Sequence, residues 1–329
     1  MSLKCPFTYV VGGAVLLGLP VLFVRVYGKI KRQKAIPSSI CESPFKVQVE
    51  VALNAALAAG ANMQRDISLE QKNDVQTKFN SIDFATETDR ANEKMIFDIL
   101  RREFPGHVFI GEESSAEAVD GIPNLTDSPT WIVDPIDGTT NFVHGFPLSC
   151  VSIGLCVNKE PVVGVCFCGS TDELFIAAKG CGAYLNGRPI AVSKASSLRE
   201  SLVLTEFGYS RQPQDVDRWL CAARTVMLKG AHGLRSLGSG VMDLCYMASG
   251  RVDACYAGVA GEGWKPWDYC AGAVILREAG AVLLDITGKN FDMYGKSILT
   301  ASSQTLADEL VETLAECNTL EYTLSETKK

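Results

Sequence analysis

The sequence predicts an α+β protein in which an α+β first half is followed by an α/β second half. Hydrophobic residues make up 47% of the 329 residues and charged residues 21%, a balance typical of a globular protein with a large core. Residues 148–176 contain three β-rich runs separated by short turns, which indicates an antiparallel meander. After residue 200, helical and β-rich patterns alternate, as they do in α/β folds.

The chain begins with an apolar stretch that we expect to be a membrane anchor. Residues 7–24 contain no charge, and as a helix they would extend roughly 27 Å, close to the roughly 30 Å hydrocarbon core of a bilayer. One Lys precedes this stretch and five Lys or Arg residues follow it, so the positive-inside rule predicts a cytosolic catalytic part. A signal peptide and a transit peptide are the alternatives, although no small-x-small cleavage site follows the apolar run. Residues 1–41 are therefore expected to form a single-pass anchor and a basic linker.

In the first half, an Ala-rich stripe predicts a helix over residues 45–63. A second helix is expected over residues 88–104. Residues 107–111 and 131–133 are predicted to be short strands, the second of which should stop at Pro135 because proline cannot donate to a sheet ladder.

The second half alternates between the two kinds of element. Strands are predicted over residues 202–205, 252–256 and 282–285, and helices over residues 216–228, 241–248, 269–279 and 303–316. We therefore divide the body of the chain into an α+β part, residues 42–190, and an α/β part, residues 191–329.

Charge and cysteine content narrow the class of protein. The first 41 residues carry six positive charges and no acid, so with a total of −7 the remainder carries −7 − 6 = −13. A body this acidic is a poor nucleic-acid binder and a suitable host for divalent cations. None of the 12 cysteines belongs to a Cys-x-x-Cys pair, and their scatter through apolar runs is typical of a reducing compartment.

The candidate chemistry lies in carboxylates, because the chain has no phosphate-binding loop motif, no Gly-x-Ser-x-Gly motif and no His-Glu-x-x-His motif. An apolar strand leads into Asp134 and Asp137, and a helix could begin at Thr139 or Thr140. Carboxylates bind hard cations such as Mg²⁺, and the free N–H groups of a helix start bind phosphate. The alternative is a turn in which both Asp side chains only cap the backbone.

Two further acidic segments favour a site for more than one metal ion. Glu112 and Glu113 follow a predicted strand, and Asp268 stands at the start of a predicted helix. Three such clusters in an acidic chain, with no other catalytic set, predict a multi-metal carboxylate site.

These motifs resemble the signatures of the inositol monophosphatase family. The matching segments are 86–89, 111–114, 134–142, 180–187 and 267–272, and the resemblance covers about residues 45–316. It implies an αβαβα layered sandwich and a homodimer. It also implies a Mg²⁺-dependent, lithium-sensitive phosphatase that converts inositol monophosphate to inositol and phosphate by direct attack of a metal-activated water. With the anchor, the whole fold would be this sandwich preceded by one transmembrane helix.

The resemblance further implies roles for individual residues. Glu112, Asp134 and the Ile136 carbonyl would hold one Mg²⁺, while Asp134, Asp137 and Asp268 would hold a second, and Glu112 would reach a weaker third. Thr139, paired with Asp89, would orient the attacking water, so that Thr139, Asp89 and Glu112 form the catalytic group. The implied substrate-side residues are Asp137, Gly138, Thr139, Gly208, Asp268 and Lys78, with the Gly138 and Thr139 N–H groups on the phosphate.

The chain departs from the family pattern at one substrate-side position. A family Glu that contacts an inositol hydroxyl lies seven residues before the Asp of the third motif, where this chain has Gly261. Glu262, one residue further on, is the candidate for that role. Phosphatases of the same superfamily that act on histidinol phosphate, 3′-phosphoadenosine phosphate or a sugar phosphate stay open as alternatives, as does an inactive, membrane-tethered scaffold. A phosphatase with an aspartyl nucleophile is disfavoured, because it needs Asp-x-Asp and this chain has Asp-x-x-Asp.

Overall fold

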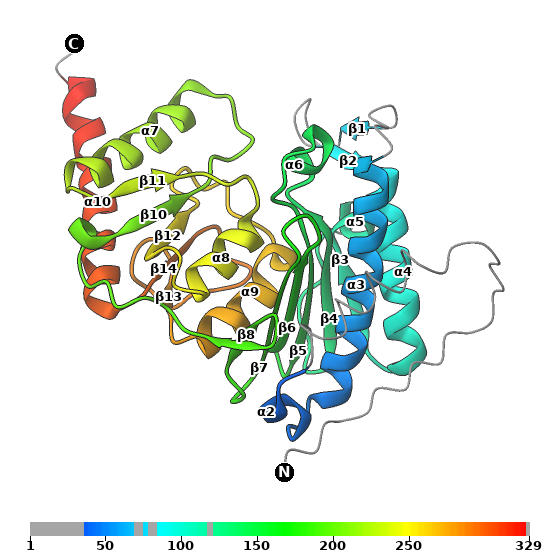
Figure 1. Ribbon diagram of the computed structural model, residues 1–329. Coiled ribbons are helices and arrows are strands. Elements are labelled where there is room, and N and C mark those ends of the chain that lie inside the picture. Colours follow the sequence, from blue (N-terminus) through cyan, green and yellow to red (C-terminus); the bar gives the residue numbers. More distant parts are fainter. Residues whose placement is uncertain (1–35, 69–74, 78–83, 117–120, 327–329) are drawn as a thin grey trace.

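In the described part of the chain, two large β-sheets alternate with three layers of helices, and a small two-stranded sheet of β1 and β2 lies beside them (Figure 1). The computed structural model describes residues 36–68, 75–77, 84–116 and 121–326. The strand order is β3-β4-β5-β6-β7-β8-β9 in the seven-stranded sheet and β11-β10-β12-β14-β13 in the five-stranded sheet. The predicted layered α+β architecture is confirmed.

The first half of the chain forms the seven-stranded sheet and the helices on its outer face. Its strands are β3 (Val108–Gly111), β4 (Thr130–Asp137), β5 (Cys150–Val157), β6 (Glu160–Cys168), β7 (Glu173–Ala178), β8 (Ala183–Leu185) and β9 (Arg188–Ile190). The helices are α2 (Ser38–Cys41), α3 (Lys46–Ser68), α4 (Glu87–Glu103), α5 (Glu112–Ala116) and α6 (Thr139–His144), and β1 (Val75–Thr77) pairs with β2 (Phe84–Thr86). The predicted meander is confirmed as β5, β6 and β7, and β8 and β9 extend it in the same antiparallel sense.

The second half forms the five-stranded sheet and the remaining helices. Its strands are β10 (Leu202–Thr205), β11 (Gly233–Arg235), β12 (Ala254–Ala257), β13 (Val282–Leu284) and β14 (Ile298–Ala301). Its helices are η1 (Leu198–Glu200), α7 (Pro213–Leu228), α8 (Gly240–Ala248), α9 (Pro266–Glu278) and α10 (Gln304–Glu326). β10 runs parallel to β11 and β12, whereas β14 runs antiparallel to β12 and β13, so this sheet is mixed.

Three hydrophobic cores separate the layers. One lies between α3, α4 and the outer face of the seven-stranded sheet, and includes Trp131 and Val133 of β4. The next lies between the two sheets around α8 and α9, and includes Ile132 of β4. The third joins the five-stranded sheet to α7 and α10. Because β4 is buried on both faces, its residues 131–133 form a continuous apolar run rather than an alternating one.

The central helix α9 lies directly against the seven-stranded sheet because two strand positions lack side chains. A Cβ on Gly164 of β6 would lie 2.3 Å from the Ala271 carbonyl oxygen, and one on Gly154 of β5 would collide with the side chain of Cys270. Glycine at both positions lets the helix backbone approach the strands and so places the start of α9 beside β4 and β5.

The strand β4 does not stop at Pro135, contrary to the prediction. It continues to Asp137, but its ladder with β5 shifts register: Asp134 faces Ser152 and Asp137 faces Cys150. One extra residue on β4 is thus accommodated in a bulge, where the missing N–H of proline breaks no regular ladder bond.

The helices of the structure contradict the predicted membrane localisation. No helix within the described ranges, from residue 36 to residue 326 with their gaps, is long and apolar enough to cross a membrane. The two helices of 23 residues, α3 and α10, both carry charged side chains. The proposed span, residues 7–24, lies outside the described residues. The finding on the described helices contradicts the expectation of a single-pass membrane protein with a cytosolic catalytic part.

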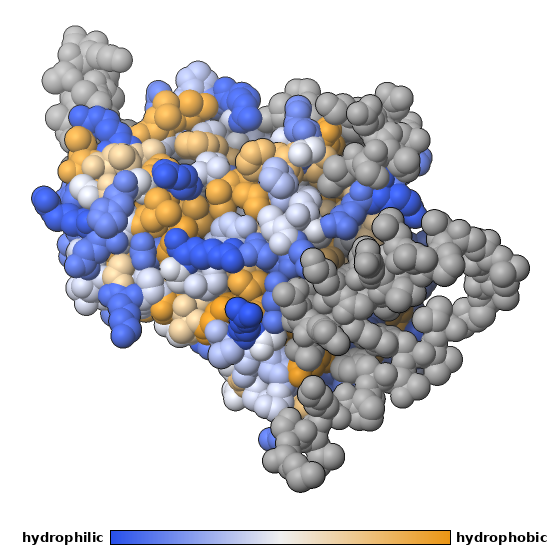
Figure 2. All heavy atoms as spheres, in the orientation of Figure 1, coloured by the Kyte–Doolittle hydropathy of each residue, from blue (hydrophilic) through white to orange (hydrophobic). Residues whose placement is uncertain are grey.

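Hydrophobic side chains on the visible surface gather in the region of α7 (Figure 2). Leu220, Met227 and Leu228 of this helix are exposed by 56%, 48% and 68%. The apolar residues on its other face, among them Trp219 and Val226, are buried.

Candidate active site

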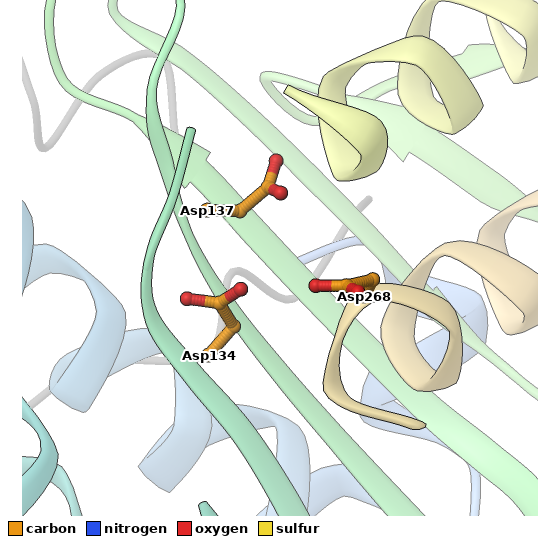
Figure 3. Close-up of side chains that lie close together, drawn as sticks. All are labelled: Asp134, Asp137 and Asp268. Atoms are coloured by element: carbon orange, nitrogen blue, oxygen red, sulfur yellow. The ribbon is translucent and has the colours of Figure 1, made fainter. Parts of the chain in front are cut away.

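Three aspartates from two distant segments converge at the ends of β4 and α9. Asp134 and Asp137 lie on β4 and Asp268 lies in the first turn of α9, and their side chains point toward one another (Figure 3). Each offers a carboxylate oxygen, and these three oxygens all lie within 4.8 Å of one another. The structure therefore brings together the three Asp residues that the sequence motifs singled out.

The bulge in β4 explains why Asp134 and Asp137 share one side. Residues three apart in a regular strand project from opposite faces. The extra residue between the Asp134–Ser152 and Asp137–Cys150 pairs changes that alternation and brings both carboxylates to the side of the strand that faces α8 and α9.

Backbone N–H groups and a serine hydroxyl orient the β4 carboxylates. Asp134 Oδ1 accepts a hydrogen bond from the Ile136 N–H at 2.9 Å. Asp137 Oδ2 accepts one from the Val241 N–H at 3.0 Å and another from the Ser239 hydroxyl. Asp137 is thus held in place by residues at the beginning of α8, a helix of the second half of the chain.

Asp268 is fixed by the way α9 begins. Pro266 occupies the first turn, where its missing N–H costs nothing, and Asp268 Oδ2 accepts the Lys265 N–H at 2.6 Å. The side chain that caps the helix is therefore the same one that faces β4.

The electrostatics of the cluster match a cation site. Burial, partly offset by the hydrogen bonds from Ser239 and Val241, raises the pKa of Asp137 to about 6, and the charge of Glu112 adds to the rise. Burial raises the pKa of Asp268 well above its usual range, and the charges of Asp137 and Glu112 raise it further. Grouped carboxylates of this kind are stabilised by a bound cation, and an all-oxygen donor set suits Mg²⁺.

Glu112 is the first residue of α5, and its charge contributes to the raised pKa values of both Asp137 and Asp268. A second glutamate, Glu93, holds the first turn of α5 in place. Glu93 of α4 is buried, and its carboxylate accepts the N–H groups of Glu113 at 2.8 Å and Ser114 at 2.9 Å. A Cβ on Gly111 would collide with the Glu93 carboxylate, so glycine is required there for this close approach. Glu93 was not expected as a site residue, because nothing in the sequence of α4 distinguishes it from a surface glutamate.

Thr139 and Asp89 meet as predicted. Thr139 Oγ1 lies 3.3 Å from Asp89 Oδ1 and 2.9 Å from the Ile136 carbonyl oxygen, and all three residues are buried. The chain turns into α6 at Gly138, whose φ of 80° lies in the left-handed region. A Cβ on Gly138 would also lie 3.0 Å from the carbonyl oxygens of Leu148 and Gly238, so both backbone conformation and space favour glycine.

The predicted substrate-side residues Gly208 and Glu262 lie against each other beside α7. A Cβ on Gly208 would lie 2.6 Å from Glu262 Cγ. Glu262 Oε1 accepts the Trp219 indole N–H at 2.7 Å, and Oε2 accepts the Ala260 N–H at 2.8 Å. Both carboxylate oxygens thus have protein partners. Lys78 lies outside the described residues.

Comparison with known proteins bears on what this arrangement does. The model of the "Inositol monophosphatase family" matches residues 46–319. The chain belongs to the inositol monophosphatase family. Among its relatives, inositol monophosphatase 1 of Solanum lycopersicum is 46% identical over 80% of this chain and 93% of its own length. Inositol monophosphatase 1 of Bos taurus is 38% identical over 82% of this chain and 94% of its own length.

Solved structures of the family share the fold. The extragenic suppressor protein suhB from Bartonella henselae superposes with a TM-score of 0.73 at 32% identity, over 82% of this chain and 98% of its own. Inositol monophosphatase from Anabaena (Nostoc) sp. PCC 7120 superposes with a TM-score of 0.69 at 33% identity, over 83% and 97%. This member of the inositol monophosphatase family is a Mg²⁺-dependent phosphatase, a phosphoric monoester hydrolase, and Asp134, Asp137 and Asp268 form an acidic cluster that could bind its metal.

Proposed function

We propose that this phosphatase hydrolyses inositol monophosphate to inositol and phosphate with two to three Mg²⁺ ions. The observation that carries the proposal is the convergence of Asp134, Asp137 and Asp268, with Glu112 acting electrostatically on the same cluster. The relatives named inositol monophosphatase, at 38–46% identity over most of the chain, support the choice of substrate.

We assign the metal-holding roles to Glu112, Asp134, Asp137, Asp268 and the Ile136 carbonyl oxygen. Bound Mg²⁺ would neutralise charge on the phosphate oxygens and make water a stronger nucleophile. Asp134 and Asp137 are set by the β4 bulge and Asp268 by the capped start of α9, so their carboxylates need little reorganisation to hold a cation.

Thr139 and Asp89 would orient the attacking water. When the Thr139 hydroxyl donates to Asp89, its oxygen lone pairs are free to accept a hydrogen bond from that water and so hold it in position. The N–H groups of Gly138 and Thr139, at the turn into α6, would hold the phosphate. Lys78, Asp137 and Asp268 complete the proposed substrate contacts.

We assign recognition of the inositol ring to Gly208 and Glu262. The Glu262 carboxylate already accepts hydrogen bonds from Trp219 and Ala260, so an inositol hydroxyl would have to use its remaining lone pairs. Histidinol phosphate, 3′-phosphoadenosine phosphate and sugar phosphates are therefore the competing substrates.

Phosphate release from a panel of inositol, sugar, nucleotide and histidinol monophosphates tests the substrate. We expect inositol monophosphate to give the highest kcat/KM, and faster turnover of another ester would redirect the proposal.

Asp134→Asn and Asp268→Asn should abolish turnover while circular dichroism stays near that of the wild type, because each removes a charged ligand. Full turnover in either variant would refute the site assignment.

Two structural expectations belong to the same proposal. Residues 42–190 and 191–329 would act as two halves of one catalytic unit, since Asp134 and Asp137 come from the first and Asp268 from the second. We also propose that the protein is a homodimer, which sedimentation velocity tests directly; a monomer at micromolar concentration would refute it.

Inhibition by lithium is expected from the same metal site. Li⁺ is small enough to enter a site lined by carboxylate oxygens, but its single charge would stabilise the leaving oxygen less well than Mg²⁺. Turnover measured at fixed Mg²⁺ should fall as LiCl is added, with NaCl at equal ionic strength as the control. Equal effects of the two salts would contradict the prediction.

A further inference from the structure

Asp243 is a buried carboxyl group that the proposed reaction does not use. It lies in the first turn of α8 and is fully buried (0% exposed). Neither of its carboxyl oxygens receives a hydrogen bond from an N–H or O–H donor. The carboxyl group of Glu206, which follows β10, is the charged neighbour that acts on it most strongly. Two facing carboxylates that are both ionised would repel each other strongly in a buried setting, so this pair needs a proton.

Glu206 holds the loop of residues 236–239, which leads into α8. Glu206 Oε1 accepts the N–H groups of Leu237 at 2.6 Å and Gly238 at 2.8 Å. Glu206 Oε2 accepts the Ser236 hydroxyl at 2.9 Å. Three consecutive residues are thus bound to one side chain, so the direction of the Glu206 carboxylate decides where the loop lies.

The same loop supports the metal cluster at several points. Its last residue, Ser239, donates its hydroxyl to Asp137, and Val241 just beyond it donates its N–H to the same oxygen. The Leu237 carbonyl oxygen accepts the Asn141 amide at 2.7 Å. The Gly238 carbonyl oxygen packs against the turn at Gly138, where it would lie 3.0 Å from a Cβ. A displacement of the loop would therefore move both Asp137 and the turn at Gly138.

We propose that Asp243 is a positioning residue for the metal site: as a neutral carboxylic acid it donates a hydrogen bond to Glu206 and keeps that carboxylate turned toward the 236–239 loop. The inference rests on the proposed function, because it takes the Asp137 cluster as the Mg²⁺ site. It concerns how Asp243 and Glu206, which touch neither metal nor substrate, hold Asp137 in place through the 236–239 loop.

The contacts decide which member of the pair carries the proton. Glu206 accepts three donors, the pattern of an ionised carboxylate, whereas Asp243 accepts none. Asp243 is also the more deeply buried of the two. Burial, the charge of Glu206 and the charge of Asp137 all raise the pKa of Asp243, the direction that retention of a proton requires.

Three substitutions in the full chain separate positioning from simple stability. Asp243→Asn keeps a hydrogen-bond donor toward Glu206, and Asp243→Leu keeps the size but removes the donor. Met247→Ala is the matched control, because Met247 is equally buried one turn further along the same helix and its side chain makes none of the hydrogen bonds named above. Mg²⁺ binding is measured by titration calorimetry, together with the thermal midpoint in chelator.

We expect Asp243→Leu to weaken Mg²⁺ binding by about tenfold or more, as loss of supporting contacts around metal ligands does. Asp243→Asn should bind Mg²⁺ within about twofold of the wild type, because its amide still donates to Glu206. Met247→Ala should lower the thermal midpoint because it leaves a cavity in the core, but it should leave Mg²⁺ binding within about twofold, because it removes no hydrogen bond to the loop.

Other results overturn the inference. Equal weakening by Asp243→Asn and Asp243→Leu would show that the donor is irrelevant, and equal weakening by Met247→Ala would show a merely structural role. If Asp243→Leu does not fold, Glu206→Gln replaces it, and unchanged Mg²⁺ binding in that variant refutes the positioning chain. A wild-type protein that binds no Mg²⁺ and releases no phosphate would instead refute the proposed function itself.

Discussion

At the scale of single residues, the site places acidic side chains where burial opposes their charge. Asp134 is 2% exposed and Asp137 is 7% exposed, and both lie within reach of Asp268. The fold compensates with backbone donors, such as the Ile136 and Val241 N–H groups, rather than with bulk solvent. These contacts offset only part of the free energy lost when the charged carboxylates are buried. The pKa values of Asp137 and Asp268 therefore remain raised.

The buried Asp243 gives a prediction with a definite sign. Its pKa is raised in the folded protein, so as pH rises above the unfolded value the unfolded chain loses this proton first and the folded state is penalised. Asp243→Asn removes that penalty. In chelator, the thermal midpoint of the variant minus that of the wild type should therefore increase between pH 4 and pH 8. A difference that is constant across this range would contradict the prediction.

Glu93 gives a second prediction at this scale. Its carboxylate accepts two N–H groups of α5, so Glu93→Ala should cost about 2 kcal/mol of stability and should weaken Mg²⁺ binding by loosening Glu112. Urea unfolding and calorimetry measure the two effects. The next residue supplies the control: Lys94 is exposed on the same helix, and Lys94→Ala should change stability by less than about 0.5 kcal/mol.

Residue-level prediction from the sequence succeeded where a motif is local and failed where support comes from far away. Asp134 and Asp137 share one short segment, so their spacing shows in the sequence. Glu93 is 20 residues from the turn that it holds, and Glu206 is 31 residues from Leu237. Nothing near either glutamate marks the partner, because only the folded chain brings them together.

At the scale of elements, the position of α9 depends on two glycines of the sheet beneath it. Gly164→Val should lower the thermal midpoint strongly and weaken Mg²⁺ binding, because a Cβ would meet the Ala271 carbonyl oxygen at 2.3 Å and push the helix that carries Asp268. Gly106→Ala is the control, since nothing lies within 4 Å of a Cβ there. Thermal scans and Mg²⁺ titrations compare the two. Similar Mg²⁺ affinity in both variants would show that α9 is not set by this contact.

The same scale shows which elements a sequence pattern can reveal. The helices α7, α8, α9 and α10 were expected within a few residues of their observed starts. α7 and α10 carry an apolar face with helical spacing, whereas α8 and α9 are buried almost all round and show in the sequence as apolar runs. β11 and β14 were missed, although β11 is as long as β13 and β14 is as long as β10 and β12, which were all expected, so strand length alone does not decide whether a pattern reveals a strand. The continuation of β4 past Pro135 was missed because the bulge that tolerates proline is set by the partner strand β5.

At the scale of the whole molecule, the metal ligands join two halves that are already packed together. Asp134 and Asp137 belong to the seven-stranded sheet, and Asp268 belongs to α9, which contacts both that sheet and β13 of the other sheet. A cation held by all three would therefore be lost when either half opens. The core around α8 and α9 has the same property, because it contains residues of both sheets.

Mg²⁺ should consequently stabilise the molecule as one cooperative unit. A ligand that binds only the folded state at about 100 times its Kd adds about 2.7 kcal/mol, which for a chain of this size corresponds to about 5 °C in Tm. Differential scanning calorimetry should show a single transition that moves upward with Mg²⁺ and returns in chelator. Asp268→Asn should keep the single transition but lose most of the shift, because it removes the ligand that α9 contributes. Two separate transitions, of which Mg²⁺ moves only one, would mean that the halves unfold independently and that the metal does not bridge them.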